Sequence, residues 1–219
     1  KTVALTLAVI MASSVLASCG KDSAADEAIL ELSEDIAKYL CDCKISKLAK
    51  VSTSDFESEK DDWAEDLDFS LTGPYMSEEA RVYEAIAQTI EYSIDEDSVS
   101  SSVKNQEGRV CVEFTVVDYE ELLDDPEAMT APEDFISKLD SCDEEEIELW
   151  FDFELEDGEW HISNTDEILE NLFDFRNQRF VFVPDLSRSD FDAMWFGTDW
   201  DYEGNVYTNP FYIELMLFA

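Results

Sequence analysis

Histidine and cysteine are the side chains through which this sequence could carry out nucleophilic or metal chemistry. The chain has 219 residues, with one histidine and five cysteines. Any Ser-His-Asp or Cys-His arrangement would therefore have to use His161. In an alternating strand pattern, His161 lies opposite Trp160 and Ile162, on the solvent side. We therefore expect a surface histidine without a catalytic role.

The amino-terminal residues have the pattern of a signal peptide that ends at a cysteine. After Lys1 comes an uncharged run over residues 2–16, and Leu16-Ala17-Ser18-Cys19 leads into a polar stretch. About fifteen apolar residues are too few to cross a ~30 Å hydrocarbon core but suit a signal peptide. Residues 1–18 are therefore predicted to be a signal peptide. Because such a peptide begins with Met and usually carries more basic residues, we expect a few residues to precede Lys1.

Leu16, Ala17, Ser18 and Cys19 resemble a bacterial lipobox. The resemblance implies that the Cys19 sulfur receives a diacylglyceryl group, and that a signal peptidase recognising Leu16, Ala17 and Ser18 cuts before Cys19. Two acyl chains hold a protein stably on a membrane. Residues 19–25 would then be the lipidated cysteine and a tether, placing the protein on the extracytoplasmic face of the cell membrane. The alternative is a secretory signal in which Cys19 is incidental.

The other four cysteines, an even number, allow two disulfides outside the cytoplasm. Cys41 and Cys43 lie two residues apart on an expected helix, about 200° apart around its axis. On that helix they would neither bond each other nor share a metal ion. A bridge from one of them to Cys111 or Cys142 stays open, beside the alternative of small apolar thiols near a core. No metal site is expected.

A calcium loop is suggested by Asp199-Trp200-Asp201-Tyr202-Glu203-Gly204. The pattern fails at its twelfth position, where Pro210 replaces the bidentate Glu. A hairpin turn explains the same residues. Since the chain also has no Gly-rich phosphate loop, no cofactor is expected.

Charge narrows the choice of partner. The chain has 54 acidic and 14 basic side chains, a formal charge of −40. Its 45% hydrophobic and 12% aromatic content is ordinary for a folded protein. Nucleic acids are held by Lys and Arg, so nucleic-acid binding is excluded, and direct adhesion to anionic lipid headgroups is disfavoured. An unknown protein or small-molecule partner, cationic or neutral, fits this charge.

Helical periodicity dominates the first part of the chain. Apolar residues at three- and four-residue steps predict a long amphipathic helix over residues 24–48, with a capping-box-like spacing of Ser23 and Asp26. Ser54 could cap a second helix that carries Phe56, Trp63 and Leu67 on one side. Residues 77–87 predict a further helix.

The period then changes to two. Residues 89–94 and 98–104 are weak strand candidates, and residues 110–117 and 147–155 alternate clearly. Asp157-Gly158 is a hairpin signal leading into residues 160–162. Short helices are expected over residues 119–123, 132–139 and 166–175. Helices followed by an antiparallel meander predict an α+β fold.

These features resemble the NTF2-like, or cystatin-like, domains of lipid-anchored proteins from Gram-positive bacteria. The residues that carry the resemblance are the lipobox, the long first helix from Ala24, the strand at 110–117 and the hairpin around Asp157-Gly158. It implies a cone of long helices packed on a curved antiparallel sheet over residues 26–176. Residues 177–219, rich in aromatic side chains, would be a β-rich extension packing back on this domain or a truncated second module.

This resemblance includes small dehydratases and isomerases, which place Asp, His or Tyr inside the cone. Here the inward register is apolar, and Glu113, Glu148, Asp152 and Glu154 fall on the other face. Candidate pocket-lining residues are Tyr39, Tyr83 and Tyr92, unless they are core aromatics. We expect a non-catalytic, lipid-anchored binding module. The alternatives are a dehydratase- or isomerase-like enzyme, and a ligand-capturing lipoprotein, which would need two α/β lobes.

Overall fold

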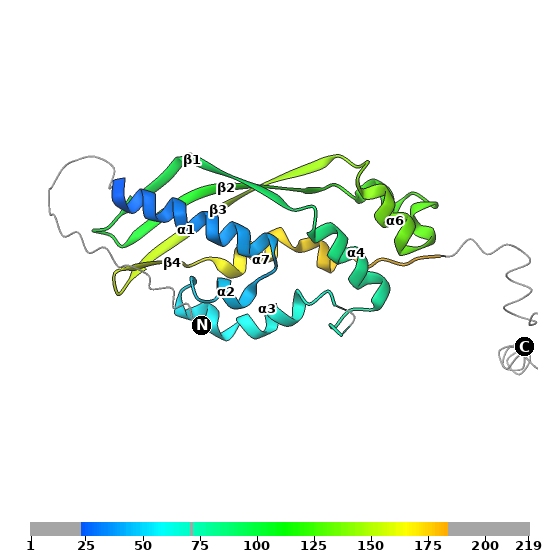
Figure 1. Ribbon diagram of the computed structural model, residues 1–219, viewed down its shortest axis with the longest axis horizontal. Coiled ribbons are helices and arrows are strands. Elements are labelled where there is room, and N and C mark those ends of the chain that lie inside the picture. Colours follow the sequence, from blue (N-terminus) through cyan, green and yellow to red (C-terminus); the bar gives the residue numbers. More distant parts are fainter. Residues whose placement is uncertain (1–22, 71, 184–219) are drawn as a thin grey trace, which may run out of the picture.

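The computed structural model describes residues 23–70 and 72–183. Within these ranges the fold is α+β, with seven α-helices and one four-stranded antiparallel sheet (Figure 1). The helices are α1 (Ser23–Cys41), α2 (Ile45–Leu48), α3 (Lys60–Asp66), α4 (Ser77–Ala87), α5 (Glu120–Leu123), α6 (Pro132–Leu139) and α7 (Thr165–Leu172). The strands are β1 (Glu91–Ser102), β2 (Glu107–Val117), β3 (Glu144–Glu156) and β4 (Glu159–Ile162). Three short 3-10 segments, η1 (Ser54–Ser58), η2 (Ala128–Thr130) and η3 (Asp174–Asn177), complete the described elements.

The sheet is a simple meander in the order β1-β2-β3-β4. The hairpin between β3 and β4 turns at Asp157 and Gly158, whose φ angles are 51° and 92°. Two positive φ values are what a tight two-residue hairpin turn requires, so the sequence signal is confirmed. The two weak strand candidates are instead one strand, β1, with a register shift between Asp95 and Ser100.

The core lies between the sheet and α1, which runs along the strands in Figure 1. Ile29, Ile36 and Leu40 form its buried stripe. The alternating residues of β2 and β3 are buried opposite, as predicted: Val110, Val112, Phe114, Val116, Leu149, Phe151 and Phe153. α1 comes so near the sheet at Gly108 that an added Cβ there would lie 2.3 Å from the Ile29 side chain.

The first helix differs from its predicted bounds at both ends. It begins at Ser23, so residues 23–25 of the expected tether are helical. It ends at Cys41 rather than continuing to residue 48, because the chain reverses at Cys43, where φ is 50°. Asp26 also does not act as the acid of the expected capping box. The Asp26 carboxylate accepts a hydrogen bond from the Ser101 hydroxyl at 2.6 Å.

The other helices follow their predicted apolar residues more closely than their predicted lengths. α4 and α6 have the predicted bounds. Phe56, Trp63 and Leu67 are buried as expected, but they belong to η1, α3 and the residue after α3, not to one continuous helix. The last predicted helix is divided into α7 and η3.

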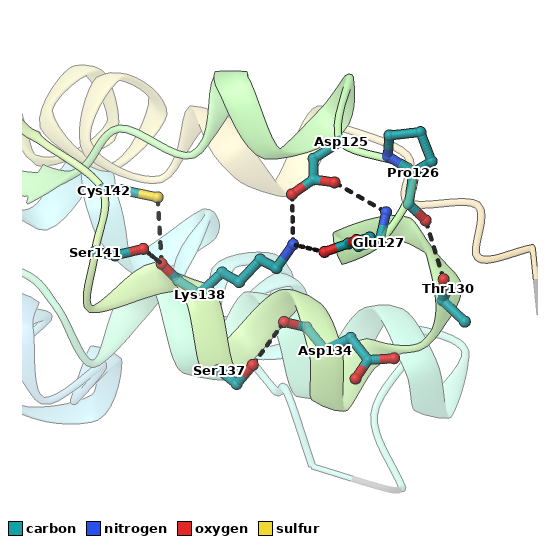
Figure 2. A network of polar contacts seen from close by, with 9 residues as sticks. All are labelled: Asp125, Pro126, Glu127, Thr130, Asp134, Ser137, Lys138, Ser141 and Cys142. Atoms are coloured by element: carbon teal, nitrogen blue, oxygen red, sulfur yellow. Dashed lines mark hydrogen bonds and ion pairs between the residues drawn. The ribbon is translucent and has the colours of Figure 1, made fainter.

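A polar network fixes the segment between β2 and β3 (Figure 2). The Lys138 ammonium on α6 pairs with the Asp125 carboxylate at 2.5 Å and the Glu127 carboxylate at 3.4 Å. The Asp125 carboxylate also accepts a hydrogen bond from the Glu127 backbone N–H at 2.9 Å. This network ties the loop before η2 to α6.

The chain after residue 176 still packs on this domain as far as it is described. The ring of Phe180, 4% exposed, lies 5.2 Å from the Phe135 ring and 5.7 Å from the Tyr83 ring between centroids. The Val183 backbone N–H donates to the Met129 carbonyl at 2.8 Å. The core therefore includes side chains beyond the boundary expected at residue 176. Residues 1–22 with Cys19, and residues 184–219 with the Asp199–Gly204 pattern, lie outside the described residues.

If Phe180 is part of the core, Phe180→Ala should lower the free energy of unfolding by about 3–5 kcal/mol, because it leaves a cavity among aromatic rings. Val181→Ala, at a neighbouring side chain that is 57% exposed, should change it by less than about 0.5 kcal/mol. Urea unfolding measures both values. Equal effects of the two substitutions would contradict the packing of residues 178–183 on the domain.

Candidate functional site

The side of the sheet that faces away from α1 is rich in acidic side chains, and we call it the outer sheet face. Its residues are set by the alternation of each strand and by the cross-strand register. They include Glu91, Ser93 and Asp95 on β1, Glu107, Arg109, Glu113 and Thr115 on β2, and Glu146, Glu148, Trp150, Asp152 and Glu154 on β3. Eight of these side chains are acidic and one is basic.

The register places like charges directly opposite each other. Glu113 pairs with Glu148, and Glu107 pairs with Glu154. Directly opposed like charges destabilise a sheet. Arg109 relieves part of this repulsion through an ion pair with Asp152, with 3.4 Å between nitrogen and oxygen. Of the ion pairs found in the described residues, this is the one on the outer sheet face.

Arg109 also covers an exposed aromatic ring. Its guanidinium carbon lies 4.2 Å from the ring centroid of Trp150, which is 41% exposed. A cation over an indole ring is favourable by about 0.5–1 kcal/mol at an exposed site. The outer sheet face thus carries one cation stacked on an aromatic ring among its carboxylates.

A hollow of about 440 Å³ lies at the end of the outer sheet face, near the β1–β2 turn. The residues that line it include Glu107, Asp152 and Glu154, Arg109, and serines of β1. Three carboxylates against one guanidinium leave the hollow negatively charged. Its acceptors and hydroxyls suit a cationic group that can donate hydrogen bonds.

One serine of this hollow is held by a buried acid that the strand pattern did not reveal. Ser101 lines the hollow, and its hydroxyl donates to Asp26, a residue of α1 that is 6% exposed. Asp26 follows the start of α1 by one turn, where helix N–H groups favour a carboxylate. Its polar position among the apolar residues of α1 was the only sequence signal. Because Ser101 pairs with Gly108, which faces Ile29, its side chain lies on the α1 side of the sheet, and its hydrogen bond to Asp26 ties β1 to α1.

His161 is less exposed than the sequence indicated. It lies opposite Glu154 in the register, but the side chain is half-buried and its Nδ1 atom is buried without a hydrogen-bond partner. The predicted outward direction of His161 is confirmed by this register, but the side chain is half-buried rather than fully exposed, and residues 51–53 run beside β4. A catalytic histidine is oriented through Nδ1 by a carboxylate, and His161 lacks that hydrogen bond.

The three tyrosines proposed to line a pocket have separate environments. Tyr83 lies in the core, where its hydroxyl donates to the Gln178 carbonyl at 2.6 Å and burial raises its pKa to about 12. The ring of Tyr92 packs against Phe114 at 6.3 Å between centroids. Tyr39 lies beneath the Lys47 ammonium at 5.2 Å. The structure does not bring them together around one pocket.

All four described cysteines have free thiols, so the bridge to Cys111 or Cys142 does not form. Burial raises the pKa of each thiol, which keeps it protonated near neutral pH. The predicted separation of Cys41 and Cys43 around a helix is wrong, because α1 ends at Cys41. Both residues line one hollow.

Comparison with known proteins finds no matching protein-family model, no matching curated protein and no matching solved structure. Across residues 23–70 and 72–183, no group of three or more His, Cys, Asp or Glu side chains is arranged to hold a metal ion. Among the helices described there, none has the length and apolarity to cross a membrane.

A double-mutant cycle can measure the repulsion across the outer sheet face. Glu113→Gln and Glu148→Gln should each raise the free energy of unfolding, and the second change should add little once the first is made. We expect a coupling of about 0.2–1 kcal/mol that decreases in high salt. A coupling of zero, or of the opposite sign, would show that these carboxylates do not repel each other.

Proposed function

We propose that this protein is a lipid-anchored, extracytoplasmic, non-catalytic binding module whose outer sheet face engages a cationic partner. The observation that carries the proposal is the outer sheet face itself, where eight carboxylates stand beside one arginine. A cationic group placed between opposed carboxylates such as Glu113 and Glu148 would replace repulsion with attraction. The carboxylates of the outer sheet face that have no basic partner therefore favour binding of a cationic partner.

The anchoring part of the proposal rests on Leu16-Ala17-Ser18-Cys19. Since α1 begins at Ser23, four residue steps separate the start of the domain from the Cys19 sulfur. These steps span at most about 14 Å. A lipid on Cys19 would therefore hold the domain close to the membrane surface, and its negative charge would keep it from adhering to anionic headgroups.

We further propose that the fold is an NTF2-like cone. Support comes from a long first helix laid against an antiparallel meander that ends in a tight hairpin. In this chain the space between α1 and the sheet is filled by Phe114, Phe151 and Phe153, none more than 1% exposed. A general base would need a carboxyl or imidazole in reach of substrate, and the buried carboxyl, Asp26, is occupied by Ser101. These observations favour binding over catalysis.

Cys19→Ala tests the anchor. Without the sulfur, no diacylglyceryl group can be attached, so the protein should move from the membrane fraction to the soluble fraction or stay unprocessed. Fractionation and metabolic labelling with a radioactive fatty acid measure this. Cys142→Ala is the matched control and should keep both the label and the membrane location. Labelling of Cys19→Ala at the wild-type level would refute the anchor.

A lysine decapeptide tests the cationic partner. Replacing Glu113, Glu148 and Glu154 with Gln should weaken peptide binding by about tenfold, since each exposed charge pair contributes about 0.2–1 kcal/mol. The control replaces Asp61 and Asp62 with Asn and Glu65 with Gln, three exposed acids of α3 on the helical side of the molecule. Fluorescence anisotropy at physiological salt measures both variants.

The control removes the same charge and should weaken peptide binding by less than about twofold. Equal losses in the two variants would mean that the peptide senses only the net charge of the protein. That result would leave the outer sheet face without a specific role in binding.

A further inference from the structure

Two thiols share one hollow at the end of α1. Cys41 is the last residue of this helix, and Cys43 follows after Asp42. Both line a hollow of about 370 Å³, together with residues 67–70 and the end of α4, including Phe69 and Glu84. This hollow is separate from the outer sheet face.

The local backbone explains why both residues reach the same hollow. The Cys43 N–H donates to the Leu40 carbonyl at 2.9 Å, and the Lys44 N–H donates to the Tyr39 carbonyl at 2.7 Å. This is the Schellman pattern, in which the reversing residue is usually glycine. Cys43 takes that position with φ 50°, at a steric cost of about 1–2 kcal/mol for a residue with a Cβ. Two residues apart, the Cα atoms of Cys41 and Cys43 are separated by at most about 7 Å.

The surroundings of the two sulfurs are negative. Burial raises the pKa of Cys41 and of Cys43 to about 11, and Cys41 itself contributes to the rise at Cys43. Asp42, which pairs with Lys44, raises both values. Glu84 on α4 lines the hollow. The negative charge of Glu91 on β1 also raises the pKa of Cys41, and Cys41 in turn raises the pKa of Tyr92. This negative charge favours a cation in the hollow, and the sulfur atoms of the two cysteines are soft ligands that could bind it.

We propose that Cys41 and Cys43 form a two-sulfur binding site for copper(I), for which silver(I) is a chemical analogue. Soft thiolate ligands select copper(I), and two of them satisfy a linear, two-coordinate ion. Zinc needs four ligands, and the described chain gathers no three metal-binding side chains. On binding, the two S–H bonds break, two S–Cu bonds form and two protons leave to solvent, with no change of oxidation state.

Proton release gives the site a steep pH dependence. A thiol with its ordinary pKa of about 8.5 is mostly protonated at neutral pH, so each bound ion displaces two protons. The apparent affinity for silver(I) should therefore rise by about 100-fold for each pH unit between pH 6 and pH 8. A site made of carboxylates would be almost independent of pH in this range.

The experiment titrates the reduced full chain with silver(I) by calorimetry, and with copper(I) under anaerobic conditions against a coloured chelator. Cys43→Gly is the main variant, because glycine suits the reversing position and the helix end should stay folded. The matched control is Cys111→Ser/Cys142→Ser, which removes two thiols elsewhere. Cys19 is present in every protein, so its contribution is the same throughout.

We expect one tight equivalent in the wild type and in Cys111→Ser/Cys142→Ser, and at least a 100-fold weaker affinity in Cys43→Gly. X-ray absorption should show two sulfur neighbours around copper. Equal affinity in all three proteins, a single sulfur neighbour or a flat pH profile would each overturn the proposal. So would a Cys41–Cys43 disulfide in protein isolated from cells and alkylated without reduction.

Discussion

The close packing of α1 against one face of the sheet determines the character of both faces. Ile29, Ile36 and Leu40 cover the apolar side of β2 and β3, and Gly108 lets the helix approach without a clash. Burial of apolar area is the main favourable term in folding. Since the inner face supplies the free energy of apolar burial, the outer sheet face can carry polar and charged side chains.

That division explains how the outer sheet face tolerates charges that oppose one another. Each like-charge pair costs a fraction of a kcal/mol, whereas one fully buried phenylalanine such as Phe151 contributes about 1.5–3 kcal/mol. The fold can therefore tolerate the cost of placing Glu113 opposite Glu148, because that cost is small beside the burial on the inner face. The same carboxylates, left without cations, are the basis of the proposed affinity for a basic partner.

Sequence periodicity predicted much of the fold because burial follows the geometry of single elements. The bounds of α4 and α6, the inward residues of β2 and β3, and the Asp157-Gly158 turn all follow from local pattern. The end of α1 could not be predicted in this way, since the residue that reverses the chain is Cys43 and not glycine. The hydrogen bond from Ser101 to Asp26 joins residues 75 positions apart, which no local pattern reports. Of the candidate site, the acidic outward register of β3 was predictable, whereas its pairing with β1 and β2 needed the structure.

The most direct test of the central claim is an amide chemical-shift map of the protein titrated with a lysine decapeptide at physiological salt. If the outer sheet face is the binding surface, the shifts should concentrate on β2 and β3 around Arg109 and Trp150, and the indole N–H of Trp150 should shift with them. Shifts spread evenly over the acidic residues of α1, α3 and α7 would contradict the account. They would show that the charge of the whole molecule, rather than one face of its sheet, attracts the cation.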